Sequence, residues 1–351
     1  LLTPRRVCVA RSTDLLVHPD QIQNLRLRTK VIKALRARLD AEGFLEVETP
    51  ILHTVHGGAS ARPFRTYINA YGEDLTLRIA PELYLKRLVV GGSGPVYELG
   101  RDFRNEGADA THNPEFTVLE AYRPYADYVQ MRQLMEHLIK DAAQAVFGSV
   151  SLPLGHKASS EHTVSDVSGP WHVVSVCDAL SEALGRRVDV QTDFEELLAL
   201  AQQHGVRVHE GTGPGAIVEE LYGELVEAHT VEPTFYTDFP AETSLLAAPH
   251  RSVPGLAERW DLVINGMEIG CEYSKLADPL VQREHLTEQS LKAAAGDLEA
   301  MEVDEDFLYA LETGMPPTGG LGLGVDRLVM LLAQTQIRGV LSFPFVKPER
   351  S

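Results

Sequence analysis

The stretch 104–122 constrains the fold more than any other part of this sequence. An apolar run, 96–103, precedes its polar loop, and an alternating run, 115–122, follows the loop; both patterns are typical of β-strands. The loop between the runs contains Gly107 and Pro114, which favour turns. The sequence therefore predicts a long antiparallel hairpin with a charged loop at its tip.

One face of the second predicted strand carries side chains that could bind a ligand. Because side chains alternate along a strand, that face presents Phe116, Val118, Glu120 and Tyr122. Together with Arg104 at the start of the loop, they offer an arginine for a phosphate, an aromatic for a ring and a carboxylate for an amine. On its own this pattern also fits a charged surface hairpin, so further parts of a site are needed to favour binding.

Two further segments supply those parts, because all three together resemble the motifs of one enzyme family. The stretch 104–122 resembles motif 2 of class II aminoacyl-tRNA synthetases, in the lysyl-tRNA synthetase form. Residues 43–50 resemble motif 1, and residues 322–327 resemble motif 3. The resemblance covers the chain from about Pro19 to the C-terminus. It implies an α+β fold in which helices flank an antiparallel sheet.

The resemblance also implies how the chain is divided. Residues 1–18 would be an N-terminal linker or edge segment, and residues 19–351 would be the class II synthetase catalytic domain. Family members usually carry an upstream barrel that reads the tRNA anticodon, and we expect that barrel to be absent here. Within 173–229 we expect a structural helical insertion. Its helices are expected at 176–184, 193–204 and 215–228.

Residues 43–50, which resemble motif 1, and the helix predicted before them bear on whether the protein forms a dimer. Apolar residues recur at helical spacing over 20–42, Gly43 favours the end of that helix, and an extended run leads to Pro50. This unit could be an ordinary core helix and strand. In the resembled family it forms the interface of a homodimer, so the resemblance implies a homodimer here.

Motifs 2 and 3 imply an ATP site. Its residues would be Arg104, Glu106, His112, Asn113, Phe116, Gly324 and Arg327. Two of them would be catalytic: Arg104 would bridge the amino-acid carboxylate and the α-phosphate, and Arg327 would bind the γ-phosphate. His112 would also meet the outer phosphates. Phe116 would stack on adenine, and Glu106 would accept a hydrogen bond from the adenine amino group.

A second hairpin carries the candidate metal ligands. Asn265-Gly266 between two extended runs is the strongest short signal for a two-residue hairpin. In a strict hairpin Asp261 lies opposite Gly270 and shares a face with Glu268. Away from any other motif these would be two solvated carboxylates. Beside a triphosphate they suit Mg²⁺, which takes oxygen ligands, so ATP and Mg²⁺ are the implied cofactors.

The resemblance assigns another group of residues to the amino-acid substrate. The group is Gly58, Glu82, Arg104, Glu120, Tyr122, Cys271, Tyr273 and Lys275. The backbone at Gly58 and the carboxylate of Glu82 would meet the α-amino group, and Tyr122 would contact the ε-amine of a lysine. From composition alone, a ligand-free loop and an ordinary helix start fit Gly58 and Glu82 equally well.

One strand of this pocket departs from the family pattern. Lys275 occupies the position of the carboxylate that pairs with the ε-ammonium of lysine, and Cys271 and Glu272 replace an asparagine and a small residue. Two ammonium groups in one pocket repel each other. Either Lys275 points away or Glu272 pairs with it. If a bulge at Gly270 puts Glu268 on the side of Lys275, lysine should be a poor substrate and a neutral or anionic side chain should be preferred.

Composition limits the partners and the location. The formal net charge is −18, so the overall charge gives no support for a basic nucleic-acid surface. Three cysteines match no zinc spacing, and this low, odd count suits a reducing cytoplasm. No run has the length of a membrane span, and the N-terminus lacks a signal-peptide core. We therefore expect a cytoplasmic protein.

Three functions remain open. The first is ATP-dependent activation of an amino acid as its adenylate, followed by transfer to tRNA or to a substitute acceptor in a protein, lipid or carrier pathway. The second is a fragment of an ordinary lysine–tRNA ligase in which Lys275 is incidental or engineered. The third is a non-catalytic regulator that binds ATP and an amino acid, against which the intact Arg104 and Arg327 argue. The sequence names neither the amino acid nor the acceptor.

Overall fold

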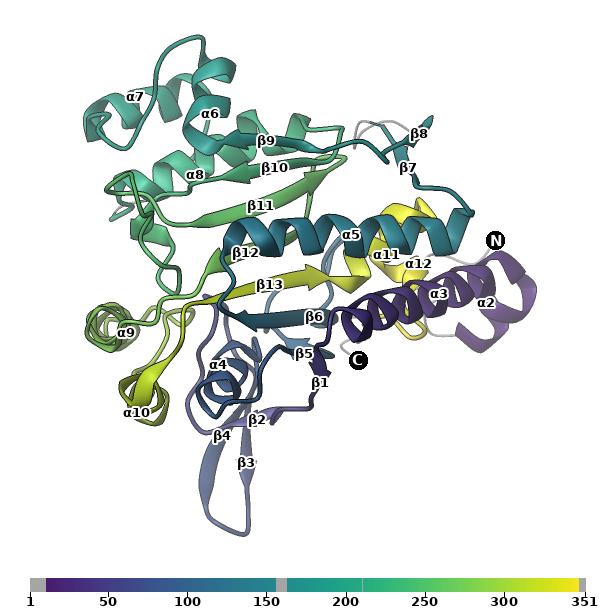
Figure 1. The fold of residues 1–351 in the computed structure, drawn as a ribbon, viewed down its shortest axis with the longest axis horizontal. Helices are drawn as coiled ribbons and strands as arrows, with labels where there is room; N and C mark the ends of the chain where they lie inside the picture. Colours follow the sequence, from purple (N-terminus) through teal and green to yellow (C-terminus); the bar gives the residue numbers. More distant parts are fainter. Residues whose placement is uncertain (1–10, 156–162, 210, 347–351) are drawn as a thin grey trace, which may run out of the picture.

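The computed structural model describes residues 11–155, 163–209 and 211–346, and its centre is an eight-stranded sheet (Figure 1). The strand order is β1-β5-β6-β13-β12-β11-β10-β9. The strands are β1 Leu45–Glu46, β5 Val96–Phe103, β6 Glu115–Pro124, β9 His172–Ser175, β10 Thr234–Thr237, β11 Arg259–Ile264, β12 Met267–Ser274 and β13 Thr318–Gly324. Only the two edge pairs, β1–β5 and β9–β10, are parallel. The predicted α+β fold is confirmed.

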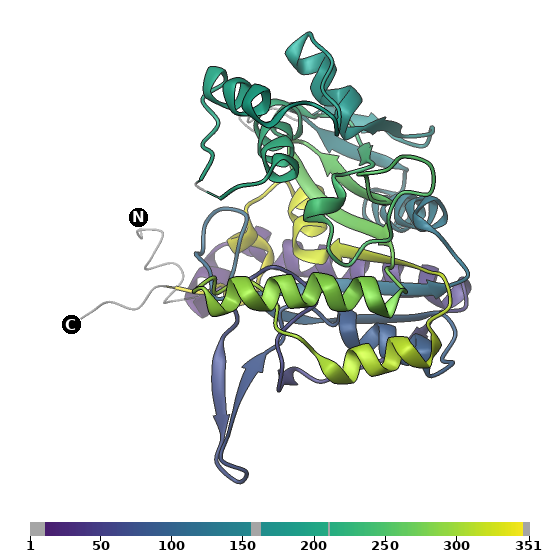
Figure 2. The ribbon, with the colours of Figure 1, turned by 90° about the vertical axis from the view of Figure 1, so that its left-hand side faces the viewer.

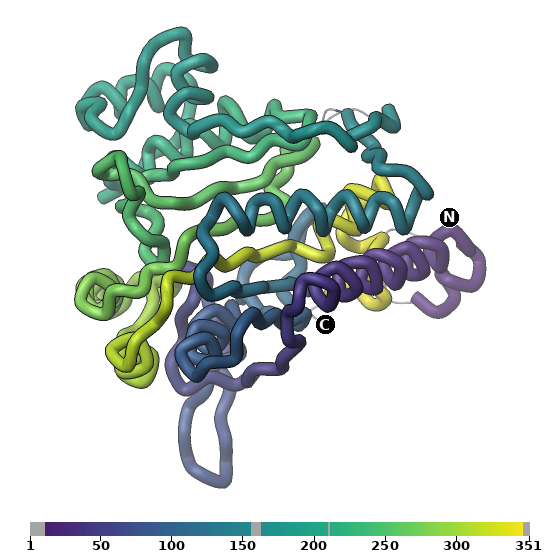
Figure 3. The backbone as a smooth tube through the Cα atoms, in the orientation of Figure 1, coloured from purple at the N-terminus to yellow at the C-terminus, as the bar shows by residue number. Residues whose placement is uncertain are grey.

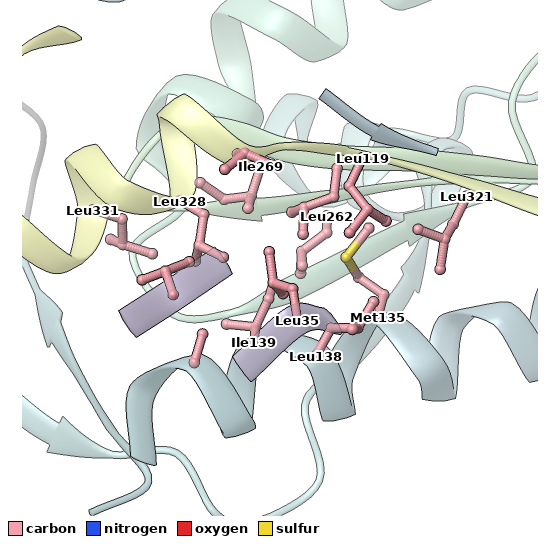
Figure 4. Packing of buried hydrophobic residues seen from close by; sticks show 14 of the residues in the cluster. Leu35, Leu119, Met135, Leu138, Ile139, Leu262, Ile269, Leu321, Leu328 and Leu331 are labelled. Carbon is pink, nitrogen blue, oxygen red and sulfur yellow. The ribbon is translucent and has the colours of Figure 1, made fainter. Parts of the chain in front are cut away.

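Three helices, of which the first two are long, cover one face of the sheet and form the main core with it. They are α3 Pro19–Ala41, α5 Tyr128–Phe147 and α11 Val325–Ala333. Figure 4 shows Leu35 of α3 and Leu138 of α5 beneath Leu119, Leu262 and Leu321 of the sheet. Leu328 of α11 lies beside the same cluster. Burying this apolar surface is the main favourable term in folding. The opposite face of β5 and β6 stays available for α4 and the polar site.

The opposite side of the sheet carries three other helices. They are α4 Glu82–Val90, α9 Pro279–Ala294 and α10 Glu305–Gly314. The short helix α12 Ile337–Val340 follows α11 and packs into the main core instead. Leu85 and Val89 of α4 pack on Val96 and Tyr122 of the sheet. Figure 2 shows α9 and α10 side by side in front of the sheet. No described helix is long and apolar enough to cross a membrane.

The remaining elements lie at the periphery, where the chain path is clearest in Figure 3. A three-stranded sheet, whose tip projects from the body, contains β2 Leu52–His53, β3 Arg65–Ile68 and β4 Glu73–Leu77. A two-stranded sheet contains β7 Ser151–Leu154 and β8 Thr163–Asp166. In the region of the expected insertion lie α6 Val176–Leu184, α7 Phe194–Gln203 and α8 Pro214–Leu225. Short 3₁₀ turns follow at Glu227–His229 and Ala241–Thr243.

The N-terminal segment is helical where it is described. Arg11–Val17 forms the helix α2, so this part is not an edge strand. The buried guanidinium of Arg11 donates to the carbonyl oxygens of Leu341 and Ser342 and pairs with Asp14 one turn later. These contacts lie about 330 residues apart in sequence, so periodicity could not reveal them. Residues 1–10 lie outside the described residues.

The strands β11 and β12 form the predicted hairpin, but they pair in a different register from the predicted one. Asn265 and Gly266 both have positive φ, at 54° and 66°, as the Asn-Gly signal predicts. The register shifts between Leu262 and Val263, so Asp261 lies opposite Cys271 and not opposite Gly270. This shift is the bulge anticipated beside Gly270. A Cβ at Gly270 would lie 2.5 Å from the carbonyl oxygen of Gly322, which makes glycine necessary there.

Candidate active site

Two adjoining cavities open over the face of β6, β12 and β13 that α3, α5 and α11 leave free. The first, the Lys275 cavity, has a volume of about 320 Å³. Its lining includes every residue that the sequence assigned to the amino acid: Gly58, Glu82, Arg104, Glu120, Tyr122, Cys271, Tyr273 and Lys275. The fold therefore brings together residues from five separate parts of the sequence.

The second cavity, the Arg327 cavity, has a volume of about 250 Å³. Its lining includes the residues that the sequence assigned to ATP: Arg104, Glu106, His112, Asn113, Phe116, Gly324 and Arg327. Arg104, Glu120 and Glu268 line both cavities. A ligand in one cavity can thus meet a ligand in the other at this shared wall.

Arg104 is exposed to both cavities and is only partly used by the protein. Its guanidinium carbon lies 5.2 Å from the ring centroid of Phe116, a cation–π distance. Its Nε is buried without a hydrogen-bond partner among the described residues. A buried donor without an acceptor is costly, so an anionic ligand at the shared wall would satisfy it.

Arg327 joins motif 3 to the loop of motif 2. Its Nη1 donates to the carbonyl oxygen of Glu268 at 2.8 Å, and its Nη2 donates to Nε2 of His112 at 3.0 Å. The other nitrogen of His112 lies 2.9 Å from the carboxylate of Asp109. Arg327 and His112 therefore lie next to each other in the lining of the Arg327 cavity, which also includes Arg104. Two guanidinium groups and an imidazole suit a ligand with several phosphates.

The two candidate metal ligands are placed differently. Glu268 lines both cavities, whereas Asp261 lines neither. Asp261 instead accepts hydrogen bonds from Nε and Nη2 of Arg259 at 3.2 and 2.9 Å. Burial raises the pKa of Asp261 to about 7; Arg259 opposes that rise, and the nearby charge of Glu268 adds to it. Arg259 also donates to Glu219, which joins β11 to α8.

These carboxylates fit the demands of Mg²⁺ in part. The described residues contain no group of three or more His, Cys, Asp or Glu side chains that could hold a metal ion. Mg²⁺ bound with nucleotides needs only one or two carboxylates, because phosphates and waters complete its shell. Asp261 and Glu268 repel each other, and a divalent cation would relieve that repulsion. The donor set therefore fits Mg²⁺ only together with a phosphate ligand.

Lys275 points into its cavity, and its pairing corrects both sequence expectations. Its Nζ donates to Oε2 of Glu82 at 3.3 Å and lies 3.5 Å from the ring centroid of Tyr273. The ring centroid of Tyr122 is 4.7 Å away. Lys275 therefore neither turns away from the cavity nor pairs with Glu272. A Cβ at Gly320 would lie 2.1 Å from Cε of Lys275, so that glycine leaves room for the side chain.

Glu272 is buried apart from the cavity. One of its carboxylate oxygens accepts from the backbone N–H of Gly320 at 2.5 Å, and the other has no partner among the described residues. Burial raises its pKa well above the usual range, although the charge of Lys275 opposes that rise. Alternation along β12 explains the placement, since Cys271, Tyr273 and Lys275 line the cavity and Glu272 lies between them.

Lys86 is a member of the site that the sequence analysis missed. It is fully buried, and its Nζ lies 2.8 Å from Oε1 of Glu82. Burial alone would raise the pKa of Glu82, but Lys275 and Lys86 outweigh burial and hold that pKa below its usual range. The spacing of four residues between Glu82 and Lys86 on one helix was the available signal.

Glu120 is a carboxyl group in a desolvated position. The hydroxyl of Tyr122 donates to its Oε2 at 2.9 Å. Burial, with smaller contributions from the charges of Asp102 and Glu82, raises the pKa of Glu120 to about 8. At neutral pH this side chain is therefore mainly a neutral acid, and it adds little negative charge to the cavity.

The raised pKa of Glu120 predicts a pH dependence of stability. Between about pH 4.5 and 8 the folded state keeps a proton that the unfolded state loses, so the unfolding free energy falls as pH rises. Each unit of pKa difference corresponds to about 1.4 kcal/mol. In Glu120→Gln this fall should be smaller, which urea unfolding at pH 5.5, 7 and 8.5 would show. Identical pH profiles for the variant and the unmodified protein would contradict the assignment.

Comparisons with known proteins show the family to which the chain is similar. The family model described as tRNA synthetases class II (D, K and N) matches residues 7–347. A protein of Mycolicibacterium vanbaalenii, the lysylphosphatidylglycerol biosynthesis bifunctional protein LysX, is 55% identical over 339 residues, covering 97% of this chain and 31% of that protein.

Two other proteins with that name are similar to this chain to nearly the same degree. The one from Nocardia farcinica is 54% identical and covers 96% of this chain and 30% of its own length. The one from Mycobacterium tuberculosis strain H37Rv is 53% identical over 354 residues, covering 99% of this chain and 30% of its own length. The chain thus spans about a third of the length of these curated relatives.

Proposed function

Because this chain belongs to the class II tRNA synthetases (D, K and N), we propose that it activates an amino acid with ATP. The products of this step are an aminoacyl-adenylate and pyrophosphate. The observation that carries the proposal is the position of Arg104, which lies in the wall shared by the two cavities with a buried, unpartnered Nε. The reacting carboxylate and the α-phosphate must meet at such a wall.

The chain's own residues account for the activation step by binding and positioning. An amino-acid carboxylate oxygen attacks the α-phosphorus, the bond to the bridging oxygen of the β-phosphate breaks, and pyrophosphate leaves with the electron pair. Arg104 would neutralise charge on both the carboxylate and the α-phosphate. Arg327 and His112 would hold the outer phosphates, and Glu82 would hold the α-ammonium group. No proton transfer is needed, so catalysis rests on orientation and charge.

Asp261 and Glu268 would hold Mg²⁺ together with phosphate oxygens of ATP. When bound, the ion neutralises negative charge on the triphosphate. Arg259 keeps the carboxylate of Asp261 oriented through two hydrogen bonds. Glu268 is held through its carbonyl oxygen by Arg327, which couples the metal ligand to the phosphate-binding arginine.

The acceptor of the activated amino acid is proposed from the relatives. Their printed name states lysylphosphatidylglycerol biosynthesis, which supports an acceptor in a lipid pathway, reached directly or through a charged tRNA. The formal net charge of −18 would repel an anionic lipid surface or a tRNA, so a basic partner segment would have to bring either acceptor to the site.

We further propose that residues 19–351 act as one catalytic domain with a helical insertion, located in the cytoplasm.

Amino-acid-dependent ATP–pyrophosphate exchange, measured with each of the common amino acids in turn, tests this function. We expect exchange with one amino acid or a small chemically related group. Binding of ATP without exchange for any amino acid would instead support a non-catalytic regulator. Efficient exchange with lysine alone would support lysine activation, either for a lipid pathway of the kind that the relatives' name states or in an ordinary lysine–tRNA ligase.

We also propose that the chain forms a homodimer through α3 and the segment that leads to Pro50. Three apolar side chains in and directly after that segment are 44% to 55% exposed, namely Leu45, Ile51 and Leu52. Sedimentation velocity at micromolar concentration should show a dimer, and the double change Leu45→Asp with Leu52→Asp should shift it towards monomer. Leu291→Asp, on an exposed part of α9, is the matched control. A purely monomeric unmodified protein would refute this interface.

A further inference from the structure

Resting on the proposed amino-acid activation, we propose that Lys275 makes the cavity select an amino acid whose side chain carries a carboxylate, and that it excludes lysine. The departure from the family pattern at this position predicted that lysine is disfavoured and that a neutral or anionic side chain is preferred. The structure adds the partner through which the selection works, which is Glu82.

Lys275 already fills an ammonium-binding position. Its Nζ is surrounded by the carboxylate of Glu82 at 3.3 Å and by the rings of Tyr273 and Tyr122, with centroids at 3.5 and 4.7 Å. A carboxylate and two aromatic faces are the groups that bind an ammonium ion most strongly in a protein. The protein's own side chain therefore occupies the place where a substrate ammonium would be held.

The charges around Glu82 leave no place for two more cations. The described residues put two ammonium groups, those of Lys86 and Lys275, against the single carboxylate of Glu82. Both lysines are almost completely buried. Glu120 provides little further negative charge at neutral pH, because burial raises its pKa to about 8. A bound lysine would bring an α-ammonium and an ε-ammonium into this region.

An acidic amino acid keeps the charges matched. Its α-ammonium can share Glu82, and its side-chain carboxylate can accept hydrogen bonds from Lys275, which has three N–H donors and one carboxylate partner among the described residues. Its α-carboxylate remains for Arg104. The hydroxyl of Ser244 lines the same cavity and is buried without a partner among the described residues, so it can donate to the same ligand.

Binding of stable adenylate analogues separates this inference from the chemistry of activation. The probes are 5′-O-sulfamoyl adenosines that carry aspartyl, asparaginyl, glutamyl, glutaminyl or lysyl groups, and titration calorimetry gives their dissociation constants. We expect the better of the two acidic probes to bind about tenfold or more tightly than its amide, and more tightly than the lysyl probe. Lys275→Met should abolish the preference for the acid over the amide, and Lys275→Arg should retain it.

The control is Lys292→Met, an identical change at an exposed position of α9, which should leave the preference unchanged. Tightest binding of the lysyl probe to the unmodified protein would overturn the inference, and that result requires no variant to fold. An acid preference that persists in Lys275→Met would also overturn it. If the acid preference holds but no amino acid supports pyrophosphate exchange, the inference stands and the proposed activation fails.

Discussion

Arg104→Ala should lower amino-acid-dependent ATP–pyrophosphate exchange by about 100- to 1,000-fold, because removing one preorganised charge at a reacting centre has that effect. The side chain lies in the wall common to both cavities and is held over Phe116. It has no ion pair in the described structure that its loss would break, so thermal unfolding should change little.

Arg327→Ala should lower exchange similarly, with a larger loss of apparent affinity for ATP.

A matched control for Arg104→Ala is Arg101→Ala. Arg101 lies on β5 of the same hairpin, is exposed, and pairs only loosely with Glu115 at 3.3 Å. Exposed pairs of this kind contribute at most about 1 kcal/mol. Arg101→Ala should therefore keep nearly full exchange activity. Near-normal exchange in Arg104→Ala would refute the role of the shared wall.

Glu82→Gln should destabilise the fold by about 3 to 5 kcal/mol, because it breaks a buried ion cluster and leaves its cations unpaired. Lys86 is fully buried and has Glu82 as its ion-pair partner, and Lys275 depends on the same carboxylate. The neutral amide fills the same space, so the loss would come from charge and not from a cavity. Urea unfolding at pH 7 measures this free energy directly.

Glu288→Gln is the control for this prediction, since Glu288 is an exposed residue of α9. It should change the unfolding free energy by no more than about 0.5 kcal/mol. Adding Lys275→Met to Glu82→Gln should recover part of the loss, because one unpaired ammonium is removed. If Glu82→Gln unfolds at the same urea concentration as the unmodified protein, the buried cluster does not have the charge state described here.

The parts that the sequence predicted well depend on local pattern. Alternation along 115–122 placed Phe116, Glu120 and Tyr122 on one face, and all three line the cavities. The Asn265-Gly266 signal predicted its hairpin for a similar reason, because positive φ at two successive residues strongly favours those residue types. The resemblance to the family's motifs then predicted which distant segments lie together in one site.

The features that the sequence did not predict depend on contacts between distant segments. Glu82 and Lys275 lie 193 residues apart, so no local pattern shows that they pair. The strict register placed Asp261 opposite Gly270, and the bulge moved it opposite Cys271. The helix at Arg11–Val17 is fixed by carbonyl groups near residue 341. Each of these outcomes is set by the packed fold and not by local propensity.

The central claim is that an amino-acid carboxylate attacks the α-phosphate of ATP at the wall formed by Arg104. The most direct test supplies an amino acid with ¹⁸O in both carboxylate oxygens, traps the activated product with hydroxylamine, and analyses AMP by mass spectrometry. The account predicts that each AMP carries one ¹⁸O atom and that pyrophosphate carries none. Unlabelled AMP, or label in pyrophosphate or phosphate, would contradict it.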